Sequence, residues 1–287
     1  NQIANTTNYT NTIAYNDVVY VRIEDSGNCV SISTLALTVN ALPKVTREAS
    51  GLFVCKDNPD YFVTIDAAIL EGLPTDYTYN WFQNGVPMGE TTYAIQVNQA
   101  GIYTVEVTRL GCTVTRSIVV EESENANIES VVVNDLVTIF NTIEVNVQGS
   151  SLGDYVFALH SANGPFQESN TFYDVPAGIY ELYIKDLLAC GVFGPIQVNV
   201  LGLPKYFTPN GDGFNDTWNI TGVDAQHNGK SIVFIFDRYG KLLKQISPLG
   251  VGWDGIYNDQ LLPSEDYWYN IQLQDGRNIK GHFTLKR

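Results

Sequence analysis

The chain has few of the residues on which most metal-dependent and helical proteins rely. Its 287 residues include one Met, three His and four Cys, and only 16% of them are charged. His160, His227 and His282 lack the spacing of metal ligands, either to one another or to a Cys pair. No phosphate-binding glycine loop occurs either, and the carboxylates are scattered. These absences predict a protein that is not an enzyme and needs no cofactor.

Long apolar runs and helical periodicity are also missing. Because no stretch of 18 apolar residues occurs, we expect no membrane-spanning helix. Apolar and polar residues instead alternate, as in residues 103–108, and the chain holds 17 Tyr and 13 Phe. This pattern predicts an almost all-β fold. Since the chain begins at Asn1 without a signal peptide, we expect a C-terminal fragment of a longer protein.

Basic residues are scarce, and the deficit is uneven. The chain has 31 acidic and 16 basic side chains, a net charge of −15. Residues 204–287 contain nine of each, which leaves 22 acidic and 7 basic side chains in residues 1–203. Binding to nucleic-acid phosphates requires the opposite charge, so that class is excluded. An acidic β-rich array is typical of a secreted or surface protein.

A tyrosine followed by a cysteine recurs along the chain. Cys29, Cys112 and Cys190 stand nine, nine and ten residues after Tyr20, Tyr103 and Tyr180. Each Cys precedes an alternating strand, so one structural unit is repeated. Short strands with turns every 8–12 residues predict immunoglobulin-like sandwiches. The Gly-x-Tyr motif before two of these strands resembles the tyrosine corner of such domains.

The repeat and three candidate linkers predict four modules. Residues 1–42 are expected to be a partial immunoglobulin-like module, and residues 43–121 and 122–203 two complete ones. Residues 204–287 are expected to form a small C-terminal antiparallel β-sandwich whose last strand is structural.

The cysteines suggest an oxidising compartment. Cys55 and Cys112 fall within the module 43–121, and we predict a disulfide between them. The partner of Cys29 is expected before Asn1. For Cys190 two interpretations stay open, namely a buried unpaired thiol or a reactive, intermolecular one. Trp81 is expected in the core, at the place where an immunoglobulin-like strand packs its Trp against the disulfide.

Five spaced motifs mark the last segment. They read FTPNGDGFNDTW (207–218), IFDRYGK (235–241), GWDG (252–255), LP with DYWY (262–263 and 266–269) and GHFTLK (281–286). In this order they resemble the gliding-motility-associated, type B C-terminal sorting domain of Bacteroidetes proteins. The resemblance covers about residues 203–287.

The resemblance implies a folded signal for export and retention. Members of this family are exported across the outer membrane by the type IX secretion system, whose translocon would be one partner. An outer-membrane barrel protein that retains type B cargo at the surface would be another. The implied location is the cell surface or the extracellular space. We therefore expect the C-terminal part of a cell-surface adhesin, with the repeats as its stalk.

Two other functions remain open. The chain could be the tail of an exported polysaccharide-degrading enzyme or protease whose catalytic domain lies upstream. Residues 43–203 could instead be carbohydrate-binding modules, which would require exposed coplanar aromatic side chains.

The expected contact residues for the export machinery are those of the motifs. They are Thr208, Pro209, Asn210, Gly211, Asp212, Gly213, Asn215, Asp216, Trp218, Asp237, Arg238, Tyr239, Gly240, Lys241, Trp253, Asp254, Gly255, His282, Lys286 and Arg287. For Trp218, Trp253 and Trp268, packing in the core or at its edge competes with an aromatic platform for sugar. For Arg238 and Lys241, partner contact competes with a solvated turn.

The loop after Phe207 raises the question of calcium. Asn210, Asp212, Asn215 and Asp216 share the Asn-x-Asp-Gly pattern of calcium loops, so calcium is the candidate ion. A full EF-type loop is absent, because Thr208 stands at the first ligand position. The alternative is that these side chains cap the amides of their own turn.

Overall fold

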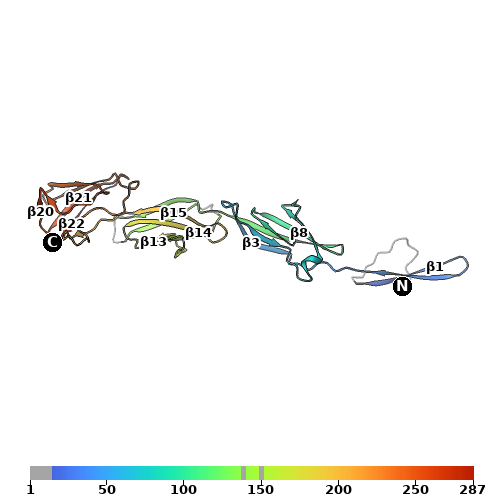
Figure 1. Cartoon of the computed structure of the whole chain (residues 1–287). Helices are drawn as coiled ribbons and strands as arrows, with labels where there is room; N and C mark the ends of the chain where they lie inside the picture. Colours follow the sequence, from blue (N-terminus) through green and yellow to red (C-terminus); the bar gives the residue numbers. More distant parts are fainter. Residues whose placement is uncertain (1–14, 137–139, 149–151) are drawn as a thin grey trace. The chain divides into compact units, whose positions relative to one another are not determined.

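The computed structural model describes residues 15–136, 140–148 and 152–287, and almost every element in them is a β-strand (Figure 1). One turn of 3₁₀ helix, η1 (Pro74–Asp76), is the exception among the described residues. The all-β prediction is therefore confirmed. The described part of the chain contains no helix long and apolar enough to span a membrane. The chain divides into two compact units, residues 1–53 with 62–121, and residues 54–61 with 122–287.

The first unit begins with an isolated hairpin of two strands. Strand β1 (Asp17–Glu24) pairs antiparallel with β2 (Val30–Leu37), with Asp17 opposite Leu37 and Glu24 opposite Val30. Its large apolar side chains, Tyr20 and Ile32 among them, are exposed. This hairpin corresponds to the last two strands of the repeated unit.

The segment from residue 43 to 121 forms two sheets. Its strands are β3 (Glu48–Cys55), β4 (Val63–Asp66), β5 (Thr78–Gln83), β6 (Val86–Pro87), β7 (Ala94–Val97), β8 (Gly101–Arg109) and β9 (Cys112–Ser123). One sheet has the order β3-β9-β8-β5-β6 and the other pairs β4 with β7. Trp81 on β5 is fully buried, as predicted, and its indole N–H donates to the carbonyl of Thr92 at 2.9 Å.

The second unit contains the next segment of the same kind. Its strands are β10 (Ile128–Asn134), β11 (Thr142–Val147), β12 (Tyr155–Leu159), β13 (Thr171–Phe172), β14 (Gly178–Asp186) and β15 (Gly191–Val200). They form the sheets β10-β11-β13 and β12-β14-β15. A core that includes Ile143, Leu182 and Val200 lies among these strands.

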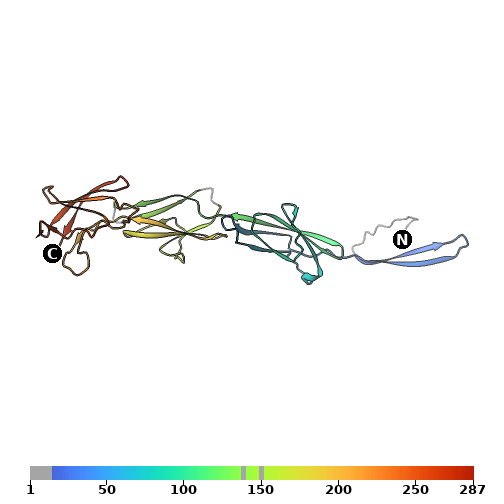
Figure 2. The same ribbon diagram turned by 45° about the horizontal axis from the view of Figure 1, so that its top comes forward.

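Residues 204–287, here called the terminal module, complete the second unit (Figure 2). The strands are β16 (Tyr206–Phe207), β17 (Ile232–Phe236), β18 (Leu242–Ile246), β19 (Ile256–Tyr257), β20 (Gln260–Leu261), β21 (Asp266–Gln272) and β22 (Asn278–Leu285). The main sheet has the order β16-β22-β21-β17-β18. The last strand, β22, therefore lies between the first strand and the penultimate one. The last strand of the sheet β3-β9-β8-β5-β6, β9, has the same two neighbours. One detail differs from the expectation: β16 pairs with β22 in parallel.

The tyrosine corner is present, and it extends into the terminal module. Three tyrosine hydroxyls donate to the backbone carbonyl four residues earlier, at 2.7–2.9 Å: Tyr103 to Gln99, Tyr180 to Pro176 and Tyr267 to Pro263. Each tyrosine lies on the penultimate strand of its segment. Burial raises the pKa of Tyr267 to about 12, because the phenolate would lose its hydration.

The predicted disulfide between Cys55 and Cys112 is wrong. Cys55 is bonded to Cys190, with a Cα–Cα distance of 4.9 Å, and Cys112 is a free thiol. The reason is the direction of β3, which runs alongside β9 in parallel, as the backbone bonds from Ser117 to Arg47 and from Lys56 to Ser123 show. Cys55 therefore lies near Ser123, at the opposite end of β9 from Cys112, roughly 35 Å away at the usual rise per residue.

Both interpretations of Cys190, the buried unpaired thiol and the reactive or intermolecular one, are wrong as well. Cys190 closes the hairpin between β14 and β15, and its bond with Cys55 joins that hairpin to the end of β3. The bond spans 135 residues of sequence, and closing so long a loop would stabilise the fold by about 5 kcal/mol in the chain-entropy account. Trp81 is thus a core residue without a disulfide beside it.

Thiol mapping tests this pairing. We expect peptides containing Cys55 and Cys190 to remain linked in a non-reducing digest, while Cys29 and Cys112 react with iodoacetamide in the folded chain. Reduction should release the linked pair. A Cys55–Cys112 peptide would contradict the structure.

The core of the terminal module is aromatic and includes the end of the chain. Phe283 on β22 stacks on Trp218 with ring centroids 3.9 Å apart and an interplanar angle of 9°. Phe207, Trp253 and Tyr267 surround the pair, all of them buried. Because β22 lies between β16 and β21, the last residues of the chain belong to an inner strand of the sheet.

Truncating the Phe283 side chain should therefore strongly destabilise the terminal module. We expect Phe283→Ala to lower the free energy of unfolding of the terminal module by about 3–5 kcal/mol. Urea unfolding followed by tryptophan fluorescence reports the change, since Trp218 and Trp253 are buried beside the ring. Lys280→Ala, on the exposed side of the same strand, is the control and should change stability little. Equal effects of the two variants would contradict this packing.

Candidate functional site

The loop from residue 208 to 216 is held in a defined shape by its own backbone. The N–H of Thr208 donates to the carbonyl of Asn215 at 2.7 Å, which closes the loop. Gly211, Gly213 and Asn215 have positive φ angles of 78°, 88° and 51°. Glycine reaches this region without a steric penalty, and Asn tolerates it better than most residues, which explains the composition of the motif.

The two carboxylates of the loop face its own amides. Asp216 accepts the N–H groups of Asn210 and Gly211 with one oxygen, at 3.0 and 2.7 Å, and that of Gly213 with the other, at 2.8 Å. Asp212 accepts the N–H of Phe214 at 2.8 Å, and this hydrogen bond lowers the pKa of Asp212.

This arrangement bears on the calcium hypothesis. It corresponds to the alternative in which these side chains cap their own turn. The described residues contain no group of three or more His, Cys, Asp or Glu side chains arranged for a metal ion. Asp212 and Asp216 thus cap the amides of their own turn in this structure.

The turn between β17 and β18 is built in a similar way. Asp237 accepts the N–H groups of both Tyr239 and Lys241 at 2.9 Å. The guanidinium of Arg238 forms an ion pair with Glu265, which raises the pKa of Arg238. The ammonium of Lys241 lies 4.6 Å from the centre of the Tyr257 ring. These two cations are therefore positioned by neighbours, yet both remain exposed.

The motif around Trp253 requires glycine for a steric reason. Gly255 has a φ of +77°, and a Cβ atom there would approach a methyl carbon of Leu285 to 2.4 Å. Asp254 caps the turn by accepting the N–H of Ile256 at 3.0 Å. The tight turn thus lies directly against the last buried residue of the chain.

The final two residues are fixed in place. Arg287 donates from its guanidinium to the carbonyls of Leu262 and Gly255, both at 3.2 Å, and its backbone N–H donates to the hydroxyl of Ser264. The N–H of Lys286 donates to the carbonyl of Phe207, and its ammonium lies 4.2 Å from the centre of the Tyr206 ring. Four cations, Arg238, Lys241, Lys286 and Arg287, are held in this way.

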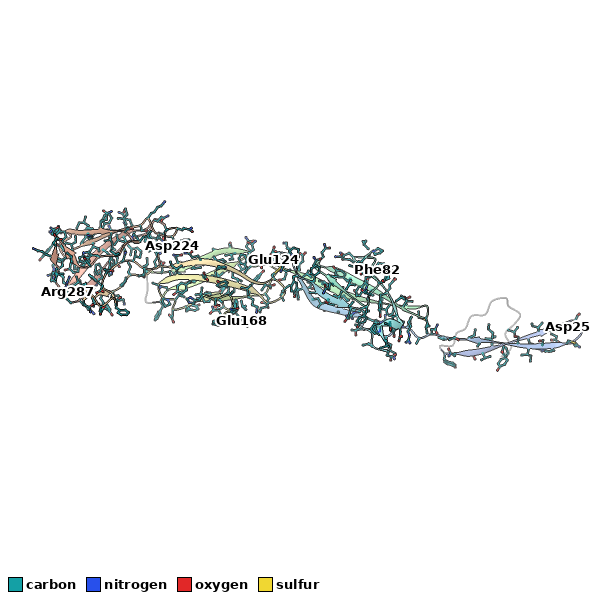
Figure 3. The ribbon with its side chains drawn as sticks, in the orientation of Figure 1. Asp25, Phe82, Glu124, Glu168, Asp224 and Arg287 are labelled. Carbon is teal, nitrogen blue, oxygen red and sulfur yellow. A yellow bond between two sulfur atoms is a disulfide. The ribbon has the colours of Figure 1, made fainter. Side chains whose placement is uncertain are left out.

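Strand register brings most of the predicted residues to one end of the terminal module. Thr284 on β22 lies opposite Tyr206 on β16 and Asp266 on β21. Strand β17, which pairs with β21, ends just before the turn that contains Arg238. The 208–216 loop, the 237–241 turn, Gly255 and the last two residues therefore share the end of the main sheet at which β22 stops. We call this the motif end. Arg287 lies there, whereas Asp224 lies at the opposite end of the module (Figure 3).

Three predicted residues lie elsewhere. Trp218 and Trp253 are fully buried, which confirms packing in the core and leaves them no part in an exposed sugar platform. His282 lies on the outer face of β22, opposite Trp268, which is 41% exposed. The ring centroids of these two residues are 6.4 Å apart.

Sequence reasoning missed two features of the motif end. The first is Phe214, which is 76% exposed although an aromatic residue in a motif suggests the core; Tyr239, which was among the predicted contact residues, is 86% exposed. The signal for Phe214 was its position between Gly213 and Asn215, where the loop turns back. The second feature is Glu265, which no motif highlighted and which pairs with Arg238.

The fold defines an array of immunoglobulin-like modules that ends in a compact β module. Residues 201–285 match the family model of the CHU_C type IX secretion signal domain, and the predicted sorting domain is thereby confirmed. Residues 1–43 match the Flavobacterium inter-domain disulphide bond domain. No curated protein matches the chain.

Solved structures of similar fold are distant in sequence. Domains of titin match at 13% identity and a TM-score of 0.38, covering 63% of this chain and 73% of theirs. The N-terminal eight Ig domains of Down Syndrome Cell Adhesion Molecule match at 12% identity and a TM-score of 0.34, covering 97% of this chain and 44% of theirs. A Bacteroides ovatus protein, SGBP-B of a mixed-linkage glucan utilization locus, matches at 15% identity and a TM-score of 0.22, covering 86% of this chain and 69% of its own.

The secretion signal domain fixes the location of the protein. It is handled by the type IX secretion system and exported across the outer membrane, to the cell surface or the extracellular space. The disulfide between Cys55 and Cys190 is consistent with that oxidising location.

The capping role of Asp216 leads to a prediction about the loop. We expect Asp216→Ala to destabilise the terminal module by about 1–2 kcal/mol, because three amide groups lose their acceptor. Asp216→Asn keeps one carbonyl oxygen and should have a smaller effect. Thermal unfolding of the whole chain, with EDTA and with millimolar CaCl₂, measures both. A large rise in the wild-type midpoint with CaCl₂, lost in Asp216→Ala, would instead establish calcium.

Proposed function

We propose that this chain is the C-terminal part of a cell-surface adhesin, in which immunoglobulin-like modules form a stalk and the terminal module is the export and retention signal. The observation that carries this proposal is the segregation of the motif residues. They gather at one end of the terminal module, whereas the other end carries Asp224 and Arg277, which bind side chains of residues 122–200. The end with Asp224 and Arg277 thus contacts the preceding segment, and the motif end remains available for recognition by a partner protein.

We assign recognition to the motif end and to two partners, the type IX translocon and an outer-membrane barrel protein. The exposed groups there include aromatic side chains, which are enriched in protein interfaces, and cations held on turns, which can supply the polar rim of an interface. Phe214 and Tyr239 supply the aromatic surface, and Lys241 and Lys286 the charge. Several carboxylates at this end, including those of Asp216 and Asp237, accept hydrogen bonds from backbone amides and therefore contribute less negative charge to the surface that a partner meets.

The stalk proposal draws on the cysteines. The Cys55–Cys190 bond joins the hairpin of one segment to the first strand of the segment before it. Cys112 lies in the corresponding hairpin, with its sulfur 3.5 Å from the carbonyl of Asn40, as the sulfur of Cys190 lies 3.5 Å from that of Ser123. Residues 1–43 match an inter-domain disulphide bond domain. This match supports a disulfide between Cys112 and the first strand of the module to which residues 1–42 belong.

The rival hypothesis is the tail of an exported polysaccharide-degrading enzyme or protease. The two differ in what precedes Asn1. Further copies of the Tyr-to-Cys repeat would support the adhesin, whereas a domain with a catalytic constellation would support the enzyme. Loss of cell attachment on deletion of the parent gene, without loss of hydrolytic activity, would favour the adhesin.

A localisation assay tests recognition of the motif end. The whole chain, fused behind a fluorescent protein with a periplasmic signal peptide, should reach the surface of a type IX-secreting cell. We expect Phe214→Ser/Tyr239→Ser/Lys241→Gln/Lys286→Gln to reduce the surface-exposed fraction by more than half, because the partner loses its contacts while the core stays intact.

The matched control removes the same number of charges elsewhere in the module. Lys230→Gln/Lys280→Gln alters two lysines outside the motif end and should leave surface display unchanged. A second control lacks residues 283–287 and should stay in the periplasm, because the module does not fold. Normal display of the four-residue variant would refute recognition of the motif end but leave the secretion domain itself intact.

A further inference from the structure

The hairpin that ends each segment reaches back to the segment before it, and this hairpin occupies a fixed place in the repeat. Measured from the tyrosine of the tyrosine corner, Cys190 follows Tyr180 by ten residues, and Arg277 follows Tyr267 by ten residues. Cys190 closes the β14–β15 hairpin, and Arg277 closes the β21–β22 hairpin. Arg277 is therefore the positional equivalent of Cys190.

The two residues that these hairpins contact are equivalent as well. Cys55 is the last residue of β3, the first strand of its segment, and it is bonded to Cys190. Asp135 directly follows β10, the first strand of the next segment, and it forms an ion pair with Arg277 at 2.5 Å. A disulfide at one joint thus stands where an ion pair stands at the next.

Each link also fixes the connection between its two segments. At the first joint, the N–H of Lys56 donates to the carbonyl of Ser123 at 2.8 Å, just before the connection. At the second, the other carboxylate oxygen of Asp135 accepts the N–H of Leu201 at 2.9 Å, within the connection. Arg277 is additionally held by Asp275, at 2.8 Å.

We propose that the Asp135–Arg277 pair is the non-covalent counterpart of the Cys55–Cys190 bond, a reversible clamp between the terminal module and the segment before it. The side chain of Asp135 is 2% exposed and that of Arg277 is 43% exposed. While the two segments are docked, the buried carboxylate favours the closed pair, since losing Arg277 alone would leave an uncompensated buried charge. Opening nevertheless breaks no covalent bond, so the terminal module can separate and return without redox chemistry.

Hydrogen exchange at the two connections tests the proposal, because the amide of Leu201 is bonded to Asp135 and that of Lys56 to Ser123. In the whole chain, we expect Arg277→Gln to speed exchange in the peptide around residues 199–205 by roughly tenfold or more. Exchange around residues 54–60 should stay unchanged. A mild phosphine reductant should have the reverse effect, speeding exchange around residues 54–60 and leaving residues 199–205 protected.

A double-mutant cycle separates a clamp from a general loss of stability. Asp135→Asn combined with Arg277→Gln should speed exchange at residues 199–205 no more than the larger single effect. Arg238→Gln, which removes an ion pair at the motif end, is the control and should leave that peptide protected. Additive effects of the two substitutions, an unchanged peptide in Arg277→Gln, opening of both joints by reductant, or lost protection of β21 and β22 would each overturn the proposal.

Discussion

The stacking of Phe283 on Trp218 is the contact on which the terminal module depends. It joins the fifth residue from the end of the chain to Trp218, the last residue of the first motif, at a centroid distance of 3.9 Å. Because β22 also lies between β16 and β21, neither the sheet nor the core is complete without the last strand. The terminal module, which matches the secretion signal domain, is therefore complete only with its last strand in place. The exposed turns of the motif end are rigid only because this core holds the strands from which they project.

The same plan underlies the terminal module and the segments before it. In both five-stranded sheets, the first strand lies beside the last and runs parallel to it, and a tyrosine corner precedes the last hairpin. The parallel first strand β3 sends its end toward the next segment, which places Cys55 at the joint. Asp135 likewise follows the end of a first strand, β10, although β10 pairs antiparallel with β11.

Much of this architecture was predictable from the sequence. Alternation identified the strand around residues 103–108, and the Tyr-to-Cys spacing identified the repeat, since both depend on local chain geometry. The pairing of Cys55 was not predictable, because it depends on whether the first strand runs parallel or antiparallel to its neighbour. Asp135 and Arg277 escaped notice for a related reason. They are 142 residues apart, and nothing in the local pattern around either one indicates its partner.

The site was predictable in composition but less so in orientation. The motif residues were the right ones to examine, yet Trp218 and Trp253 build the core while Phe214 is exposed. Residue type alone does not separate these roles, because a buried and an exposed aromatic side chain look alike in a motif. What separates them is the backbone: Phe214 follows Gly213 in a left-handed conformation, which turns the chain away from the sheet, whereas Trp218 bridges to Trp253. Because the motif residues are divided in this way between a core and a surface, the exposed ones can be substituted while the core that holds the fold is kept, which opens the proposed recognition surface to mutational dissection.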